Sequence, residues 1–128
     1  MKKYLVAIIL ILVLAAVTFG ACPAPFEKAK QIALRGTPNE KGLYIVTYNV
    51  NKNGEEVIYL IGYSPQYKIV AIGKSAEGAV IYEYDEDSCE CTVYVINVMF
   101  RMRVPIDREE AIKQAFLIFR EMVTEKLL

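Results

Sequence analysis

Histidine and tryptophan are absent from the 128 residues of the chain. Without histidine, the sequence excludes the Ser-His-Asp and Cys-His arrangements that activate many enzymatic nucleophiles. A serine–lysine pair needs only residues that are present. However, Ser64, Ser75 and Ser88 do not stand at the strand-to-helix turn that would expose such a nucleophile. The sequence therefore predicts a protein that is not an enzyme and that carries no cofactor.

An excess of positive charge is also missing. The chain has 15 basic and 15 acidic residues. Residues 1–21 hold Lys2, Lys3 and no acid, so the remaining 107 residues carry 13 basic and 15 acidic side chains, a net charge of −2. Nucleic-acid binding demands a basic face. The composition therefore argues against nucleic acid as a partner.

An apolar stretch without any charge follows Lys3 and runs from Tyr4 to Ala21. A basic start, an apolar middle and a small-residue end at Gly20 and Ala21 are typical of an export signal. We therefore expect residues 1–21 to be a signal peptide or membrane anchor. Residues 22–128 should form a single α+β domain outside the cytoplasmic membrane, because their number suffices for one core.

Three outcomes fit this N-terminal stretch. The sequence Phe19-Gly20-Ala21-Cys22 resembles the bacterial lipoprotein box, which implies cleavage before Cys22 and lipidation of its thiol. Ordinary signal cleavage, for instance after Gly20, would instead release a secreted protein. An uncleaved anchor is the third outcome, because about 18 residues at 1.5 Å each span roughly 27 Å of bilayer. All three predict a membrane-anchored or secreted protein.

Periodicity in the remaining chain predicts the fold. A helix should begin near Pro25 and end at Gly36, and a second should begin after Asp107, with Glu110 completing a capping box. The expected strands are Leu43–Asn51, Glu55–Tyr63, Tyr67–Gly73, Ala79–Asp85 and a long Cys89–Val104 that bends at Asn97. The prediction is thus a helix, a five-stranded antiparallel meander and a C-terminal helix packed on one face of the sheet.

The first hairpin provides the candidate binding residues. Its Asn53-Gly54 turn fixes the register, so that facing residue numbers add up to 107. This register places four tyrosines on one face: Tyr44, Tyr48, Tyr59 and Tyr63. We expect them to form either an exposed recognition surface or a face that a helix covers. The opposite face carries Ile45, Ile58 and Leu60, so both faces are apolar enough to require cover.

Cys89 and Cys91 follow an acidic turn, Asp85-Glu86-Asp87-Ser88. If Cys22 is acylated, these two cysteines remain as a pair on one strand, roughly 6.5 Å apart. The sequence leaves open free thiols or a strained disulfide. A metal site that uses Cys89 and Cys91 with a carboxylate of the turn is a further alternative.

Residues 25–72 resemble a PepSY-type domain. The resemblance rests on the helix Glu27–Ala33, the strand Gly42-Leu43-Tyr44-Ile45-Val46 and the hairpin Asn53-Gly54-Glu55-Glu56-Val57, and it does not extend to residues 89–128. It implies non-catalytic binding outside the cytoplasm, often the inhibition or restraint of a protease.

We therefore expect a membrane-tethered binding domain of the cell envelope. Its partner would be an envelope protein or a surface polymer. Alternatives are a self-associating subunit of a surface assembly, which would use Leu117 and an edge strand, and a metal-binding protein at Cys89 and Cys91.

Overall fold

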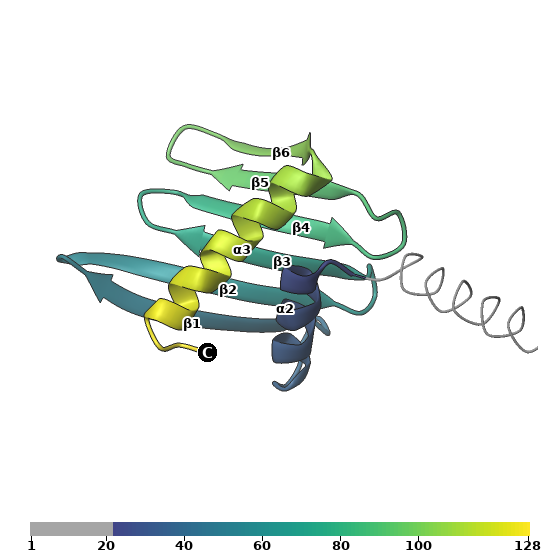
Figure 1. Ribbon diagram of the computed structural model, residues 1–128, viewed down its shortest axis with the longest axis horizontal. Coiled ribbons are helices and arrows are strands. Elements are labelled where there is room, and N and C mark those ends of the chain that lie inside the picture. Colours follow the sequence, from purple (N-terminus) through teal and green to yellow (C-terminus); the bar gives the residue numbers. More distant parts are fainter. Residues whose placement is uncertain (1–21) are drawn as a thin grey trace, which may run out of the picture.

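The computed structural model describes residues 22–128, and the predictions for residues 1–21 lie outside them. The sheet consists of β1 (Tyr44–Lys52), β2 (Glu55–Ser64), β3 (Ile69–Ser75), β4 (Ala79–Asp85), β5 (Cys91–Ile96) and β6 (Arg101–Ile106). Helix α2 (Ala24–Leu34) precedes the sheet and α3 (Arg108–Thr124) follows it. The strands lie in the order of the sequence, and each pairs antiparallel with the next, as Figure 1 shows.

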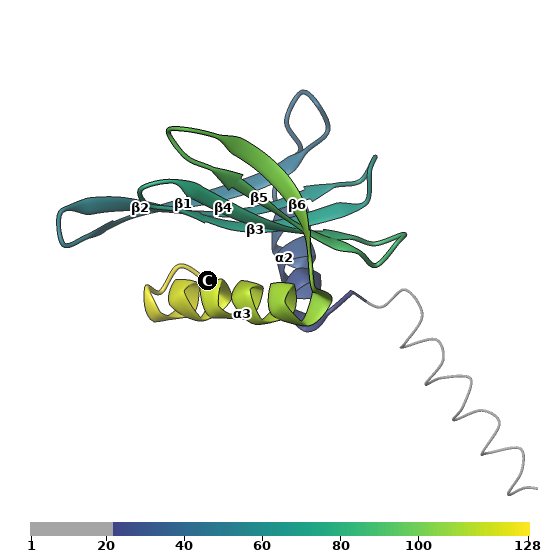
Figure 2. The ribbon, with the colours of Figure 1, turned by 90° about the horizontal axis from the view of Figure 1, so that it is seen from above.

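Both helices lie on the same face of the sheet, which Figure 2 shows edge-on. The core lies between these two layers. It consists mainly of Phe26, Ala29 and Ala33 from α2, Ala111, Ala115, Ile118, Phe119 and Met122 from α3, and Val57, Tyr59, Ile61, Val70, Ile72, Tyr84 and Cys91 from the sheet. The α+β class and the helices on one face are therefore confirmed. Neither helix within residues 22–128 has both the length and the apolar character needed to cross a bilayer.

The sheet has six strands, so the predicted single strand Cys89–Val104 is wrong. The chain reverses at residues 97–100 and forms the hairpin β5–β6. The side-chain Oδ1 of Asn97 accepts hydrogen bonds from the backbone N–H groups of Met99 at 2.8 Å and Phe100 at 2.9 Å. Such local bonds allow asparagine to close a turn without glycine or proline. Asn97 was expected to bend the strand, and it reverses the chain instead.

The predicted register of the first hairpin is confirmed residue by residue, from Tyr44 opposite Tyr63 to Lys52 opposite Glu55. Asn53 and Gly54 both have positive φ, 51° and 84°, as a type I′ turn requires. Strand β4 has the predicted bounds, whereas β3 begins and ends two residues later than expected.

The start of α3 also agrees with the sequence. The side chain of Asp107 accepts a hydrogen bond from the backbone N–H of Glu110 at 3.3 Å. The carboxylate of Glu110 accepts from Gln114 instead of from the backbone of Asp107, so one half of the predicted capping box is present. Helix α2 begins at Ala24 and ends two residues before Gly36.

Replacement of Gly54 by alanine tests the hairpin turn. A Cβ atom at this position would contact nothing within 4 Å, so the only cost is the left-handed backbone. We expect Gly54→Ala to lower the free energy of unfolding by about 1 kcal/mol. Gly36→Ala is the matched control, because Gly36 has no positive φ and its Cβ would make an ordinary 3.5 Å contact with Ala33. Urea unfolding measures both, and equal losses would contradict the assigned turn.

Candidate functional site

The four candidate tyrosines share one face, as predicted, but that face is the one that the helices cover. Tyr59 is completely buried, and Tyr44, Tyr48 and Tyr63 are half-buried against the core. Of the two alternatives for these tyrosines, a face that a helix covers is therefore the one present. The physical reason is that the apolar stripes of α2 and α3 need a sheet face to pack on, and this face offers the larger apolar side chains. A binding role for these tyrosines stays a prediction.

The hydroxyl of Tyr59 lies in a charged network between the sheet and α3. It accepts a hydrogen bond from Lys52 Nζ and donates one to Glu121 Oε2, both at 3.1 Å. Lys74 Nζ lies 2.7 Å from the same Glu121 oxygen, and Lys52 Nζ lies 3.1 Å from Glu125 Oε1. This network was not predicted, because the expected third strand ended at Gly73. Lys74 lies in β3, beyond that expected end.

The charges of this network shift the pKa values of its members. Hydrogen bonds to Tyr59 and Glu125 raise the pKa of Lys52 above its usual range. Burial alone would raise the pKa of Glu121, but the hydrogen bond and charge of Lys74 outweigh it and leave that pKa below 4.5. Both groups are therefore charged at neutral pH. The network fastens α3 to three strands.

A pH-dependent contribution to stability follows from Glu121. Because its pKa is lower in the folded than in the unfolded state, its contribution is complete above about pH 5 and disappears as the pH falls through the folded pKa. Glu121→Gln should therefore lower the free energy of unfolding at pH 7 by up to about 1 kcal/mol, a value reduced by solvent screening. The difference from the unmodified protein should vanish at low pH.

Unfolding curves at several pH values measure this effect. Glu40→Gln is the matched control, because Glu40 is exposed and outside the network. A loss from Glu121→Gln that stays constant with pH would contradict the assigned ion pair.

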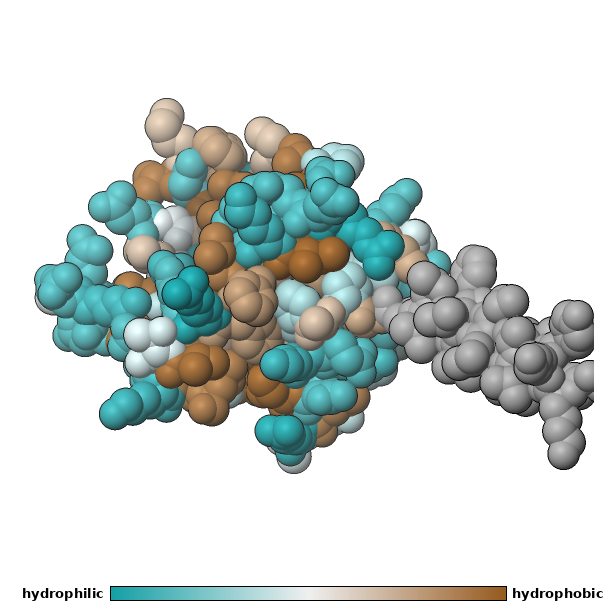
Figure 3. Space-filling model, viewed as in Figure 1, coloured by the Kyte–Doolittle hydropathy of each residue, from teal (hydrophilic) through white to brown (hydrophobic). Residues whose placement is uncertain are grey.

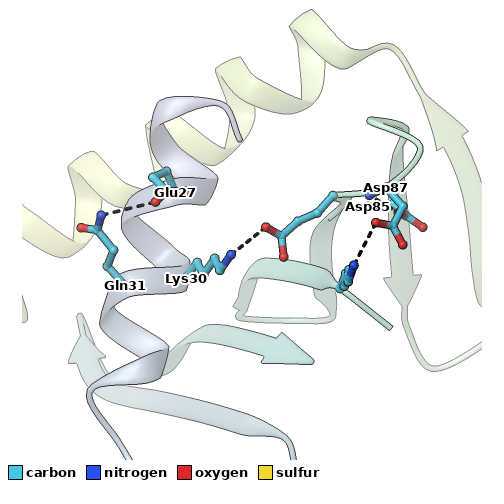
Figure 4. Close-up of polar contacts among 7 residues, drawn as sticks. Glu27, Lys30, Gln31, Asp85 and Asp87 are labelled. Carbon is cyan, nitrogen blue, oxygen red and sulfur yellow. Dashed lines mark hydrogen bonds and ion pairs between the residues drawn. The ribbon is translucent and has the colours of Figure 1, made fainter. Parts of the chain in front are cut away.

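The middle of α2 is held to the turn after β4. Lys30 Nζ lies 2.8 Å from Glu86 Oε2 and 5.0 Å from the centre of the Tyr63 ring. Figure 4 shows Lys30 reaching from the helix toward the turn that carries Asp85 and Asp87. The hydrogen bond to Glu86 raises the pKa of Lys30. This contact fixes α2 against the turn between β4 and β5.

Cys22, the predicted lipidation site, is half-buried and packs against the core. Burial raises the pKa of its thiol to about 12, with further increases from Glu86 and Glu27. The thiol is therefore neutral, and acylation would require its side chain to turn outward. Lipidation of Cys22 stays a prediction.

Cys89 and Cys91 are free thiols, as is Cys22. Cys89 has a positive φ of 60° in the turn, while Cys91 lies in β5 and is buried. Burial raises the pKa of Cys91. The nearby Asp85 carboxylate accepts hydrogen bonds from the backbone of Asp87 and Ser88. No three cysteine, histidine or acidic side chains within residues 22–128 are grouped to hold a metal ion, so the metal alternative gains no support here.

The other face of the sheet has no helix over it in Figure 2. We call it the open face, and its apolar side chains are Ile45, Ile58, Leu60, Ile69, Ala71, Ile81, Tyr94 and Ile96. Ile45 is the most exposed of them, with 49% of its surface accessible, and its neighbours partly shield one another. This face is the candidate functional site, because an apolar surface of this extent on a monomer usually makes contacts.

The centre of the open face is apolar, and an arginine at its β6 side is paired within the face. Gly73 has no side chain there, and a Cβ atom would lie 2.8 Å from Ile81 Cγ1, so Ile81 covers it. The Arg103 guanidinium lies 4.3 Å from the centre of the Tyr94 ring, and its Nε donates to Glu83 Oε1 at 2.8 Å. The arginine thus fixes the tyrosine ring and is itself neutralised.

Comparison of the chain with protein-family models, curated proteins and solved structures found no match. The resemblance to PepSY-type domains accordingly stays a prediction.

Proposed function

We propose that this protein is an exported, membrane-tethered and non-catalytic binding domain that holds another envelope protein against its open face. The observation that carries the proposal is that α2 and α3 cover one face of the sheet, whereas the other face is also apolar and lies uncovered in residues 22–128. Burial of that apolar area would supply the free energy of binding, at about 25 cal/mol per Å².

The size and charge of the open face favour a protein partner over a surface polymer. Six strands about 4.8 Å apart, each contributing about 20 Å of length, give a face of roughly 600 Å². This is close to the roughly 800 Å² that one partner buries in a standard protein interface. A polymer rich in polar groups would need a groove with hydrogen-bond donors, whereas the centre of the open face is apolar around Leu60 and Ile81.

Binding alone would suffice for the activity that the PepSY resemblance implies. A rigid sheet held near the membrane would restrain a protease, or act as an adaptor, by occupying part of its surface. Neither role requires a nucleophile or a metal.

Self-association through Leu117 and an edge strand is the alternative, and the open face adds a further surface on which a second copy could pack. An edge-strand contact is less favourable at β6, because Pro105 provides no N–H to an added strand. Strand β1 is the other edge, and Leu117 is exposed on α3.

Photo-crosslinking from the open face tests the proposal. The full chain would carry benzoylphenylalanine in place of Ile81, in cells that naturally make the protein. We expect one adduct with a different envelope protein, and none from the control position Lys113 on α3. Ile45→Glu should remove the adduct because it introduces a charge at the exposed part of the open face, whereas Tyr67→Glu in the β2–β3 turn should not.

An adduct of twice the chain mass would replace the proposal with the self-association alternative. Equal labelling from Ile81 and Lys113, or none, would contradict a role for the open face. Thermal unfolding of each variant shows whether it is folded.

A further inference from the structure

A groove lies between α2 and α3 on the outer side of the helix layer. It has a volume of about 530 Å³, and most of its surface is apolar. Its apolar walls include Ile32, Phe116, Phe119, Val123 and Leu128. Figure 3 views this side of the molecule and shows brown, apolar side chains between the helices with hydrophilic ones around them.

Part of this apolar lining faces solvent. Phe116 and Val123 are seven residues apart on α3, so they lie on one stripe, and about 60% of each side chain is accessible. Leu128 at the C-terminus extends the same surface. Side chains of this size are seldom left in water together unless they meet another apolar phase.

The charged side chains of the groove have a single sign. Lys28 on α2, Arg35 at the C-cap of α2 and Arg120 on α3 line it, and no aspartate or glutamate does. None of the three cations is in an ion pair with another side chain of residues 22–128. The groove therefore combines an apolar floor with three cations whose charge is not neutralised locally.

The position of the groove relates it to the membrane attachment. Ala24 and Pro25 line its end, and Cys22 precedes them by two and three residues. At about 3.5 Å per extended residue, the attachment point lies within roughly 10 Å of the groove. Any tether formed by residues 1–21 or by a lipid on Cys22 would hold this groove close to the bilayer surface.

We propose that the groove between α2 and α3 docks on the surface of an anionic phospholipid bilayer. Phe116 and Val123 enter the acyl boundary, and Lys28, Arg35 and Arg120 contact the phosphate headgroups. Paired amphipathic helices with basic side chains at the rim have the composition of interfacial membrane contacts. The long stems of lysine and arginine allow the charges to reach the headgroups while the apolar side chains insert.

This inference rests on the tether in the proposed function, and it adds an orientation to it. The open face lies on the opposite side of the sheet from the helices. If the helices contact the bilayer, the open face therefore points away from the membrane. In that orientation it is accessible to a protein partner in the envelope.

Tryptophan fluorescence in vesicles tests the docking, since the chain contains no tryptophan. The full chain with Phe116→Trp would be reconstituted at low density into phosphatidylglycerol vesicles with brominated acyl chains. We expect blue-shifted emission and strong quenching. The control Val98→Trp, in the β5–β6 turn and 98% exposed, should show the emission of water-exposed indole and little quenching.

Reversal of the groove charges is the second arm of the test. Arg35→Glu with Arg120→Glu in the Phe116→Trp chain should reduce the docked fraction several-fold, because each basic residue near an anionic surface changes partitioning by about fivefold. Phosphatidylcholine vesicles should have the same effect. The paired change Lys41→Glu and Arg101→Glu, at exposed residues outside both helices and outside the groove lining, should not.

The outcomes separate the two proposals. Chains that do not float with the vesicles would overturn the tether and the docking together. Chains that float but show equal quenching at positions 116 and 98 would overturn the docking alone. A blue shift at position 116 without bromine quenching would show that a protein segment fills the groove, which also overturns the docking.

Discussion

The whole structure depends on the contact between an antiparallel sheet and two helices that are too few to cover it. The core forms where α2 and α3 meet the sheet face that carries Tyr59, Ile61 and Ile72, and these side chains are completely buried. Hydrophobic burial on that face supplies the main driving force of folding. The same chain has no helix left for the other face among residues 22–128, which is why an apolar sheet surface remains exposed. Fold and candidate site therefore have one cause.

Polar contacts determine how the helices sit on the sheet. The ion pair of Lys30 with Glu86 holds the middle of α2 to the turn after β4, and the network of Tyr59 with Lys52 and Glu121 fixes the C-terminal half of α3. These contacts are partly exposed, so each contributes little energy. Their value is positional, because they hold both helices over the same face and keep the opposite face free.

The sequence predicted those parts of the fold that depend on local chemistry. The Asn53-Gly54 turn determined the register of the first hairpin, and Asp107 determined the start of α3, because backbone dihedrals and caps are set by neighbouring residues. The β5–β6 hairpin was missed because its reversal depends on side-chain bonds of Asn97 in a stretch without glycine or proline. In Cys89–Val104 the alternation of side chains typical of a strand continues across that turn. The pattern therefore predicts one strand.

The candidate site was harder to predict for a physical reason. Apolar residues occur on both faces of the first hairpin. Periodicity therefore could not decide whether the face of Tyr59 or the face of Leu60 would pack against the helices. That choice depends on tertiary packing between segments 60 residues apart, as the bond between Tyr59 and Glu121 illustrates. The open face and the groove between α2 and α3 became recognisable only once the covered face was known.

The exposure of the two faces can be compared directly by isoleucine-methyl NMR with a soluble paramagnetic agent. The account predicts strong broadening for Ile45 and weaker but clear broadening for Ile81 on the open face, with Ile61 and Ile72 protected beneath the helices. Equal protection of all four methyl groups would show that both faces are covered, and broadening of Ile61 and Ile72 would show that the helices lie elsewhere. Either result would contradict the account.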